Sequence, residues 1–320
     1  MDEPKYVRFE LDPDAPVRPW TPERMREAKP ITPRVLDPAK MKIVQRPPSA
    51  PGVRPAPSAP GGALVSAQKV KDRKSTPWRQ VCKLFLDYAD GMSGAASGVV
   101  IGKEYVLTAA HATASQRGGK IVSGSVVPAF EDGATPFGSY GVGDQFVPAP
   151  YSENQASPFD LAVVKVRRCS IGNPNAGRLI GDVVGSCGVV VNLDAQKATG
   201  VGYPSHPGGA LEMYKEQLSC TLFKQDDGYE DAAPSEFSQG ASGGPWFTEV
   251  RGATLISGLY ASHVIKPDSP YYNYAVSPHF GPDLQYFFQH FIEVVDGAEG
   301  GALDPATHSP EPTRGGERSI

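Results

Sequence analysis

The chain lacks any run of apolar residues near the roughly 18 that a membrane-spanning helix needs. It begins Met1-Asp2-Glu3-Pro4, without the charged and then apolar pattern of a secretory signal. Taken literally, these two absences predict no membrane contact and a chain that stays inside the cell. A different start codon or an unusual export route would reverse the second expectation.

Cysteine is scarce, with Cys82, Cys169, Cys187 and Cys220 as the only four. Four cysteines allow three disulfide pairings, and the sequence does not choose among them. No two have the spacing of a zinc site, so we expect neither a metal nor another cofactor.

Neither sign of charge dominates, because 31 Lys and Arg stand against 35 Asp and Glu. The distribution is uneven: residues 1–75 hold 15 basic and 9 acidic residues, a net +6, and residues 76–320 a net −10. A basic arm on an acidic body is able to dock electrostatically. Because the basic residues are scattered and form no patch, we expect no nucleic-acid partner.

Proline is concentrated in residues 1–75, which hold 14 of the 32. We therefore predict a disordered arm, with one helix over Thr21–Ala28, where a capping threonine precedes a proline and good helix formers. Near its end, Arg73 and Lys74 form a basic linker that is either a processing site or simply polar.

The remaining pattern predicts an all-β domain over residues 76–296 with many short strands. The hairpin 97–108 and the β-branched run 161–166 are its clearest strands. A helix is expected over Pro282–Val295, where apolar residues recur at helical spacing. Residues 297–320, rich in Gly and Pro, are expected to be a disordered tail.

Three motifs indicate nucleophilic chemistry. Ser242 lies in Gly240-Ala241-Ser242-Gly243-Gly244-Pro245, a glycine-rich turn that exposes a hydroxyl and allows close approach of a ligand. A serine nucleophile needs a histidine base and a carboxylate. Candidates precede it as Thr108-Ala109-Ala110-His111 and, 49 residues later, Asp160-Leu161-Ala162.

The order His, Asp, Ser in these three blocks resembles the chymotrypsin-fold serine peptidases, the trypsin-like family. The resemblance covers about residues 76 to 296. It implies two six-stranded Greek-key β-barrels with a C-terminal helix, and a serine endopeptidase acting on protein or peptide substrates as a monomer. It also implies the roles of Ser242 as nucleophile, His111 as base and Asp160 as its orienting carboxylate, with the N–H groups of Gly240 and Ser242 forming the oxyanion hole.

Departures from the family pattern place the chain on its bacterial branch. Ala112 replaces the cysteine that usually follows the histidine, and Ala241 replaces the acidic residue before the nucleophile in the chymotrypsin branch. Glutamyl endopeptidases also lack that acidic residue, and 201–204 followed by Met213 is similar to one of their blocks. A supporting serine of the family falls near Ala261.

Substrate selection has three open interpretations. Glu236, six residues before the nucleophile, lies where trypsin-like members have the base of the specificity pocket, and would favour Lys or Arg there. Alternatively, His263 and Tyr260 line the pocket and bind an acidic side chain. In the third, Glu236 is a solvated loop residue.

Two further expectations concern the whole chain. The arm resembles, over 20–25, the pro-segments of secreted bacterial trypsin-like peptidases, so we expect an inhibitory or folding-assisting pro-segment removed near Arg73 or Lys74. Secretion follows from that resemblance, with the cytoplasm as the alternative. A catalytically inactive binding module on the same fold is the rival function.

Overall fold

The computed structural model describes residues 6–12, 19–44, 66–115, 117–170, 173–195 and 197–298. Strands dominate them, which confirms the all-β expectation, and no helix in these ranges is long and apolar enough to cross a membrane. The proline-rich stretches 47–51 and 55–62 of the arm, which the sequence predicts to be linkers, and the tail from residue 299 lie outside the described residues.

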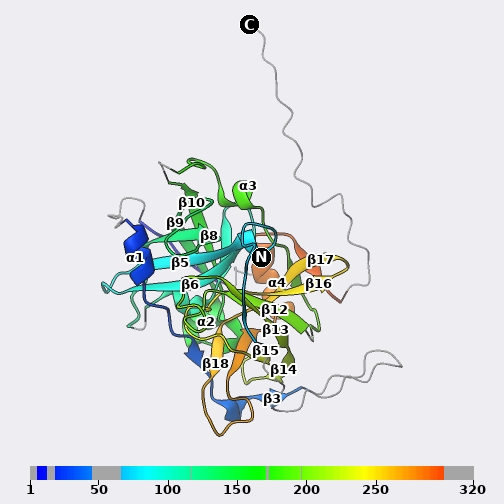
Figure 1. Cartoon of the computed structure of the whole chain (residues 1–320). Helices are drawn as coiled ribbons and strands as arrows, with labels where there is room; N and C mark the ends of the chain where they lie inside the picture. Colours follow the sequence, from blue (N-terminus) through cyan, green and yellow to red (C-terminus); the bar gives the residue numbers. More distant parts are fainter. Residues whose placement is uncertain are drawn as a thin grey trace.

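The first half of the body is a closed barrel of six strands (Figure 1). Hydrogen bonding follows the order β9-β10-β7-β6-β5-β8, and β8 pairs back to β9. Its strands are β5 (Val81–Tyr88), β6 (Ser93–Val100), β7 (Tyr105–Thr108), β8 (Ile121–Pro128), β9 (Tyr140–Pro148) and β10 (Ala162–Cys169). The predicted hairpin is β6–β7, and the β-branched run is β10, which registers Val163 against Leu107.

The second half is divided between two sheets. One has the order β20-β11-β17-β16-β12-β13-β4 and the other β2-β18-β19-β15-β14-β3. The strands of the body are β11 (Val189–Val191), β12 (Lys197–Gly202), β13 (Tyr214–Ser219), β14 (Thr221–Lys224), β15 (Tyr229–Pro234), β16 (Pro245–Val250), β17 (Ala253–Leu259), β18 (Ser262–Val264), β19 (Tyr274–Pro278) and β20 (Val294–Asp296). Strands of the arm add to the edges of both sheets.

Helices are few and short. They are α1 (Pro22–Glu27), α2 (Ala149–Asn154), α3 (Ile180–Val184) and α4 (Pro282–Gln289), with 3-10 turns at η1 (Pro38–Lys40), η2 (Trp78–Gln80), η3 (Ala110–Thr113) and η4 (Ser157–Phe159). The expected terminal helix is therefore shorter than Pro282–Val295. Its last residues leave the helix because Val294 pairs in parallel with Val189 of β11.

The arm does not fit the expectation of disorder, because its described parts wrap around the body (Figure 1). The strands are β1 (Tyr6–Phe9), β2 (Arg34–Val35), β3 (Lys42–Ile43) and β4 (Gln68–Lys69), which pair with β9, β18, β14 and β13. The predicted helix is α1, capped by the Thr21 hydroxyl. Proline prevents long regular elements here, but single edge strands need only a partner, and the body supplies one to each.

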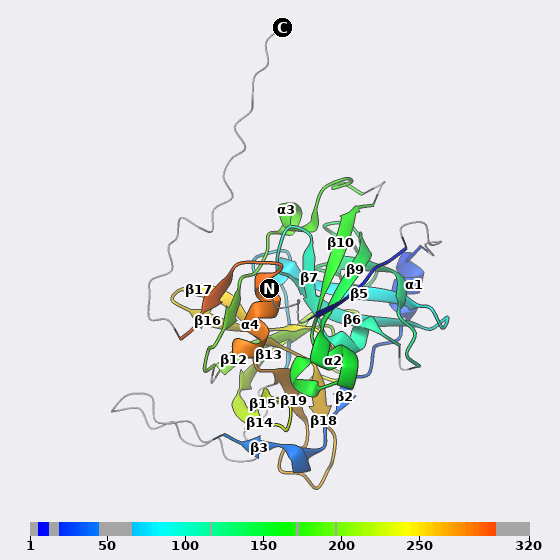
Figure 2. The ribbon, with the colours of Figure 1, turned by 180° about the vertical axis from the view of Figure 1, so that it is seen from behind.

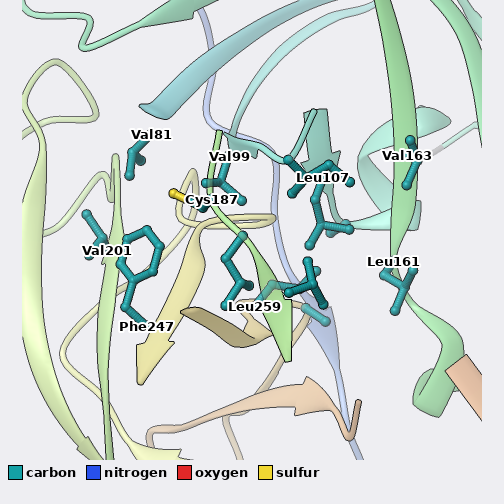
Figure 3. Close-up of a cluster of buried hydrophobic side chains, with 14 of the residues drawn as sticks. Val81, Val99, Leu107, Leu161, Val163, Cys187, Val201, Phe247 and Leu259 are labelled. Atoms are coloured by element: carbon teal, nitrogen blue, oxygen red, sulfur yellow. The ribbon is translucent and has the colours of Figure 1, made fainter. Parts of the chain in front are cut away.

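The largest buried cluster joins the two halves of the body (Figure 3). It includes Val81, Val99, Leu107, Leu161 and Val163 from the first half and Cys187, Val201, Phe247 and Leu259 from the second. Close packing across this boundary fixes the two halves relative to each other, and with them the residues at their junction.

Candidate active site

His111 and Asp160 lie on turns that end or begin buried strands. His111 follows β7 in the turn η3, and Asp160 ends η4 just before β10. β7 and β10 are paired, so the two turns meet at the same edge. Nδ1 of His111 lies 2.9 Å from Oδ2 of Asp160, and Oδ1 of Asp160 accepts the main-chain N–H of His111 at 2.9 Å. The fully buried carboxylate thus orients both the ring and its backbone.

Ser242 reaches the same histidine from the second half. Its Oγ lies 2.8 Å from Nε2 of His111, and the residue is only 2% exposed. The turn needs glycine at Gly243, which has φ +82° and where a Cβ would lie 2.2 Å from Oγ1 of Thr108. Gly243 also donates its N–H to the carbonyl of Tyr260 at 2.7 Å. The serine is therefore held on a turn wedged between the two halves.

Ser97 of β6 holds this turn to the first barrel, a role that no local sequence pattern indicates. Its hydroxyl donates to the carbonyl of Gly240 at 2.8 Å and accepts the N–H of Tyr203 at 2.9 Å. Its own N–H donates to the carbonyl of Ser242 at 2.8 Å, and its carbonyl accepts from Thr108. One buried residue thus ties the nucleophile turn to the strand that precedes His111.

Gly240, whose N–H the family resemblance assigns to the oxyanion hole, has φ +89°. Its N–H donates to the carbonyl of Ile31, a residue of the arm, at 3.0 Å. The group expected to stabilise a developing oxyanion is therefore already hydrogen-bonded to a peptide carbonyl.

Comparison with known proteins identifies the chain at this point. A family model described as a trypsin-like peptidase domain matches residues 96–255, a range that contains His111, Asp160 and Ser242. The chain belongs to the trypsin-like peptidases. It is a serine-type peptidase, and its substrates are peptides or proteins.

Solved structures of other proteases share the fold. Protease Anisep from Arthrobacter nicotinovorans is similar with a TM-score of 0.57 and 21% identity, covering 70% of this chain and 98% of that one. The thermostable serine protease AL20 from an extremophilic microorganism has a TM-score of 0.56 and 19% identity, covering 66% of this chain and 96% of that one. A Glu endopeptidase in complex with MPD has a TM-score of 0.56 and 20% identity, covering 72% of this chain and 97% of that one. No curated protein sequence matches the chain.

These likenesses confirm the chymotrypsin-like fold. The trypsin-like peptidase differs from the expected pattern behind Asp160. Ala261 has no hydroxyl to offer the carboxylate, and its N–H donates to the carbonyl of Val276. Glu230 is buried nearby, its Oε2 accepting from Gln225 at 2.6 Å. Burial, reinforced by the charge of Asp160, raises the pKa of Glu230 to about 7.

The candidates for substrate selection, Glu236, Tyr260 and His263, are all buried or partly buried in this trypsin-like peptidase. Oε2 of Glu236 accepts the N–H of Ala67 at 2.8 Å, so this carboxylate is tied to the segment just before the body. Tyr260 is buried with its ring 5.1 Å from that of Phe237. Nε2 of His263 is buried without a hydrogen-bond partner among the described residues, and burial lowers the pKa of this histidine. This shift disfavours the cationic form with which His263 would bind an acidic side chain.

A different carboxylate, Glu216 of β13, lies at the centre of this region. Its Oε1 accepts from the hydroxyls of Tyr260, at 2.7 Å, and Ser235, and its Oε2 accepts the N–H of Glu236 at 2.8 Å. Burial raises the pKa of Glu216, although these donors act in the opposite direction. Counting along the chain from Ser242 selects Glu236, whereas no sequence signal in β13 indicates that Glu216 is buried beside it.

A cavity of about 650 Å³ lies beside His111. Its lining combines residues of the first barrel with residues of the arm, among them Tyr88, Gly94, Tyr151, Pro30 and Ile31. None of Glu236, Tyr260 and His263 is in the lining. Among the described residues, no group of His, Cys, Asp and Glu is arranged to hold a metal ion.

Proposed function

We propose that this serine-type peptidase is an endopeptidase in which Ser242, His111 and Asp160 form the catalytic triad. The observation that supports the proposal is the single chain of contacts through the imidazole, 2.8 Å to the serine oxygen and 2.9 Å to the carboxylate. These distances are within the reach that proton transfer between a nucleophile and its base requires.

Each group then has one task. Oγ of Ser242 attacks the carbonyl carbon of the substrate while Nε2 of His111 accepts its proton. Asp160 keeps Nδ1 protonated and stabilises the imidazolium. The N–H groups of Gly240 and Ser242 stabilise the oxyanion, and one such donor contributes about 3 to 4 kcal/mol to lowering the barrier.

His111 then donates this proton to the leaving amine, which departs and leaves an acyl group on Ser242. In the second half of the reaction, a water molecule that gives up a proton to His111 attacks this ester. His111 returns the proton to Oγ of Ser242 as the acid is released. No group other than the three side chains and the two N–H groups is needed.

The surroundings of Ser242 favour cleavage within a chain. Main-chain groups of Ala95 lie on one side of the nucleophile and those of β18 on the other, and the arm uses both. A cleft that offers backbone partners on both sides accepts the interior of a polypeptide. We further propose that residues 76–296 form the catalytic unit.

Replacing the triad residues tests the assignment. Ser242→Ala and His111→Ala should each reduce peptide and ester hydrolysis by about 10⁴-fold or more. Ser219→Ala, at an exposed position, serves as the control. A fluorophosphonate probe should label Ser242 and leave Ser242→Ala unlabelled. Retention of more than about a tenth of the parent rate in Ser242→Ala would contradict the triad, and absence of labelling in every form would support an inactive binding module.

A further inference from the structure

Residues 29–31 of the arm lie beside the nucleophile on the His111 side. Ile31 donates its N–H to the carbonyl of Ala95 at 2.8 Å, and Ala95 donates its N–H to the carbonyl of Lys29 at 2.8 Å. The carbonyl of Ile31 accepts from Gly240 at 3.0 Å. The Ile31 side chain packs over Gly94, where a Cβ would lie 2.7 Å from its Cγ1. An arm residue thus uses the main-chain groups with which a bound substrate would pair.

Residues 34–36 lie on the opposite side of the nucleophile. There β2 lies beside β18 (Figure 2). The two strands are parallel, with Arg34 opposite Ser262 and Val35 opposite His263. Leu36 adds a hydrogen bond from its N–H to the carbonyl of His263 at 3.1 Å. We call residues 29–36 the strap, because they cross the site from the first barrel to the second half.

The strap runs in the direction opposite to that of a substrate. His111 must protonate the leaving amine, so the part of a substrate that follows the scissile bond lies on the His111 side. The acyl part therefore lies toward β18. The strap begins on the His111 side and ends at β18. The amide nitrogen of Thr32, which follows the Ile31 carbonyl, is therefore on the side away from His111. His111 cannot donate a proton to this nitrogen, so the bond between Ile31 and Thr32 is not cleaved.

Both ends of the strap are anchored. Before it, Met25 is 2% exposed, the Trp20 ring lies 5.2 Å from that of Phe85, and Arg24 forms an ion pair with the mostly buried Asp87. After it, a buried cluster combines residues of the arm and of the second half of the body. Its members are Leu36, Met41, Phe223, Ala232, Val264, Tyr274 and Val276. The strap is therefore held in an extended form on two separate hydrophobic contacts.

We propose that residues 19–44 are an inhibitor built into the chain, which fills the cleft in reverse and occupies the oxyanion donor without being cut. The proposal rests on the triad proposed above. It also changes the expected place of removal. Arg73 donates to the carbonyl of Ala129 at 3.1 Å and pairs with Glu131 at 2.8 Å, so this residue is held against the body. A cut between residues 44 and 66 would instead separate the inhibitor and leave β4 in its sheet.

The test uses the full chain, with a recognition site for a sequence-specific protease placed between residues 44 and 66. The protein is folded first and cut afterwards, so that folding does not depend on a truncated form. Hydrolysis of a peptide substrate should rise about 100-fold after the cut and removal of the arm, as expected when only one molecule in about 100 is open beforehand. A synthetic peptide of residues 19–44 should restore inhibition, and a scrambled peptide should not.

Point variants separate the strap from the rest of the arm. Ile31→Ala removes the side chain packed over Gly94 and should raise the rate of the uncut protein about tenfold. Ile43→Ala makes the same change at a position that is 52% exposed, and should leave the rate within about twofold.

Each outcome has one meaning. Equal, measurable rates before and after removal of the arm would refute the inhibitor while leaving the triad intact. Absence of hydrolysis in both forms would refute the triad and the inhibitor together. Cleavage between Ile31 and Thr32, found by mass spectrometry of the uncut protein after long incubation, would refute the reversed direction.

Discussion

Replacing Glu230 by glutamine should change how the stability of the protein depends on pH. Glu230 is 1% exposed, and burial raises its pKa from the ordinary 4.5 to about 7. The hydrogen bonds from Ser157 and Gln225 oppose this rise, Asp160 adds to it, and the charge of Arg34 opposes it. In the folded protein this carboxyl group therefore keeps its proton over a range in which the unfolded chain has lost it.

The sign of the effect follows from counting protons. Between about pH 4.5 and 7 the folded state binds more protons at Glu230 than the unfolded state, so the free energy of unfolding falls as pH rises. A pKa difference of about 2.5 units corresponds to about 3 kcal/mol at most. The stabilising contribution is complete below the unfolded pKa and is lost as pH rises through the folded pKa.

Glutamine has nearly the same shape and does not titrate. Relative to the parent, Glu230→Gln should therefore gain about 2 to 3 kcal/mol between about pH 4.5 and 8. Urea unfolding at several pH values measures this difference, with Glu153→Gln, at an exposed position, as the control. A gap between parent and Glu230→Gln that stays constant over this range would refute the reasoning.

Three further predictions concern the turn, the pocket region and the arm. Gly243→Ala should abolish fluorophosphonate labelling of Ser242, because the new Cβ would lie 2.2 Å from Oγ1 of Thr108. Gly252→Ala, whose Cβ would have nothing within 4 Å, should lower the free energy of unfolding by only about 1 kcal/mol. Equal effects of the two substitutions in labelling and in urea unfolding would contradict this. Tyr260→Phe leaves buried Glu216 with one donor fewer and should destabilise the protein by about 1 to 3 kcal/mol in urea unfolding, so a more stable variant would count against that hydrogen bond. Met25→Ala should lower the free energy of unfolding by about 2 to 5 kcal/mol, and an unchanged midpoint would show that the arm is not packed as described.

The motifs around His111, Asp160 and Ser242 could be recognised from sequence because each one is local. Gly240 to Pro245 needs its glycines for backbone reasons, and the residues beside His111 and Asp160 are short strands with clear patterns. The helix α1 was also predictable, since its cap and its proline lie within a few residues.

What the sequence did not reveal depends on distant partners. β2 and β3 are two-residue strands whose existence depends on β18 and β14, more than 170 positions away, and no local pattern announces them. The helical periodicity of Pro282–Val295 was real, but pairing of β20 with β11 overrode its second half. The burial of Glu216 could not be predicted for the same reason, because burial is decided by the fold and not by distance along the chain.

The strap is covalently joined to the site that it fills. After a cut in the arm, inhibition by the strap therefore depends on how far the protein is diluted. While the chain is whole, the arm faces its cleft at an effective concentration on the order of millimolar, whatever the amount of protein. A cut between residues 44 and 66 turns the same contacts into an association of two molecules. The contacts are unchanged at that moment, so a concentrated store of cut protein stays largely closed. Opening then follows when the protein spreads into a larger volume, and the timing of activity is set by transport as well as by proteolysis.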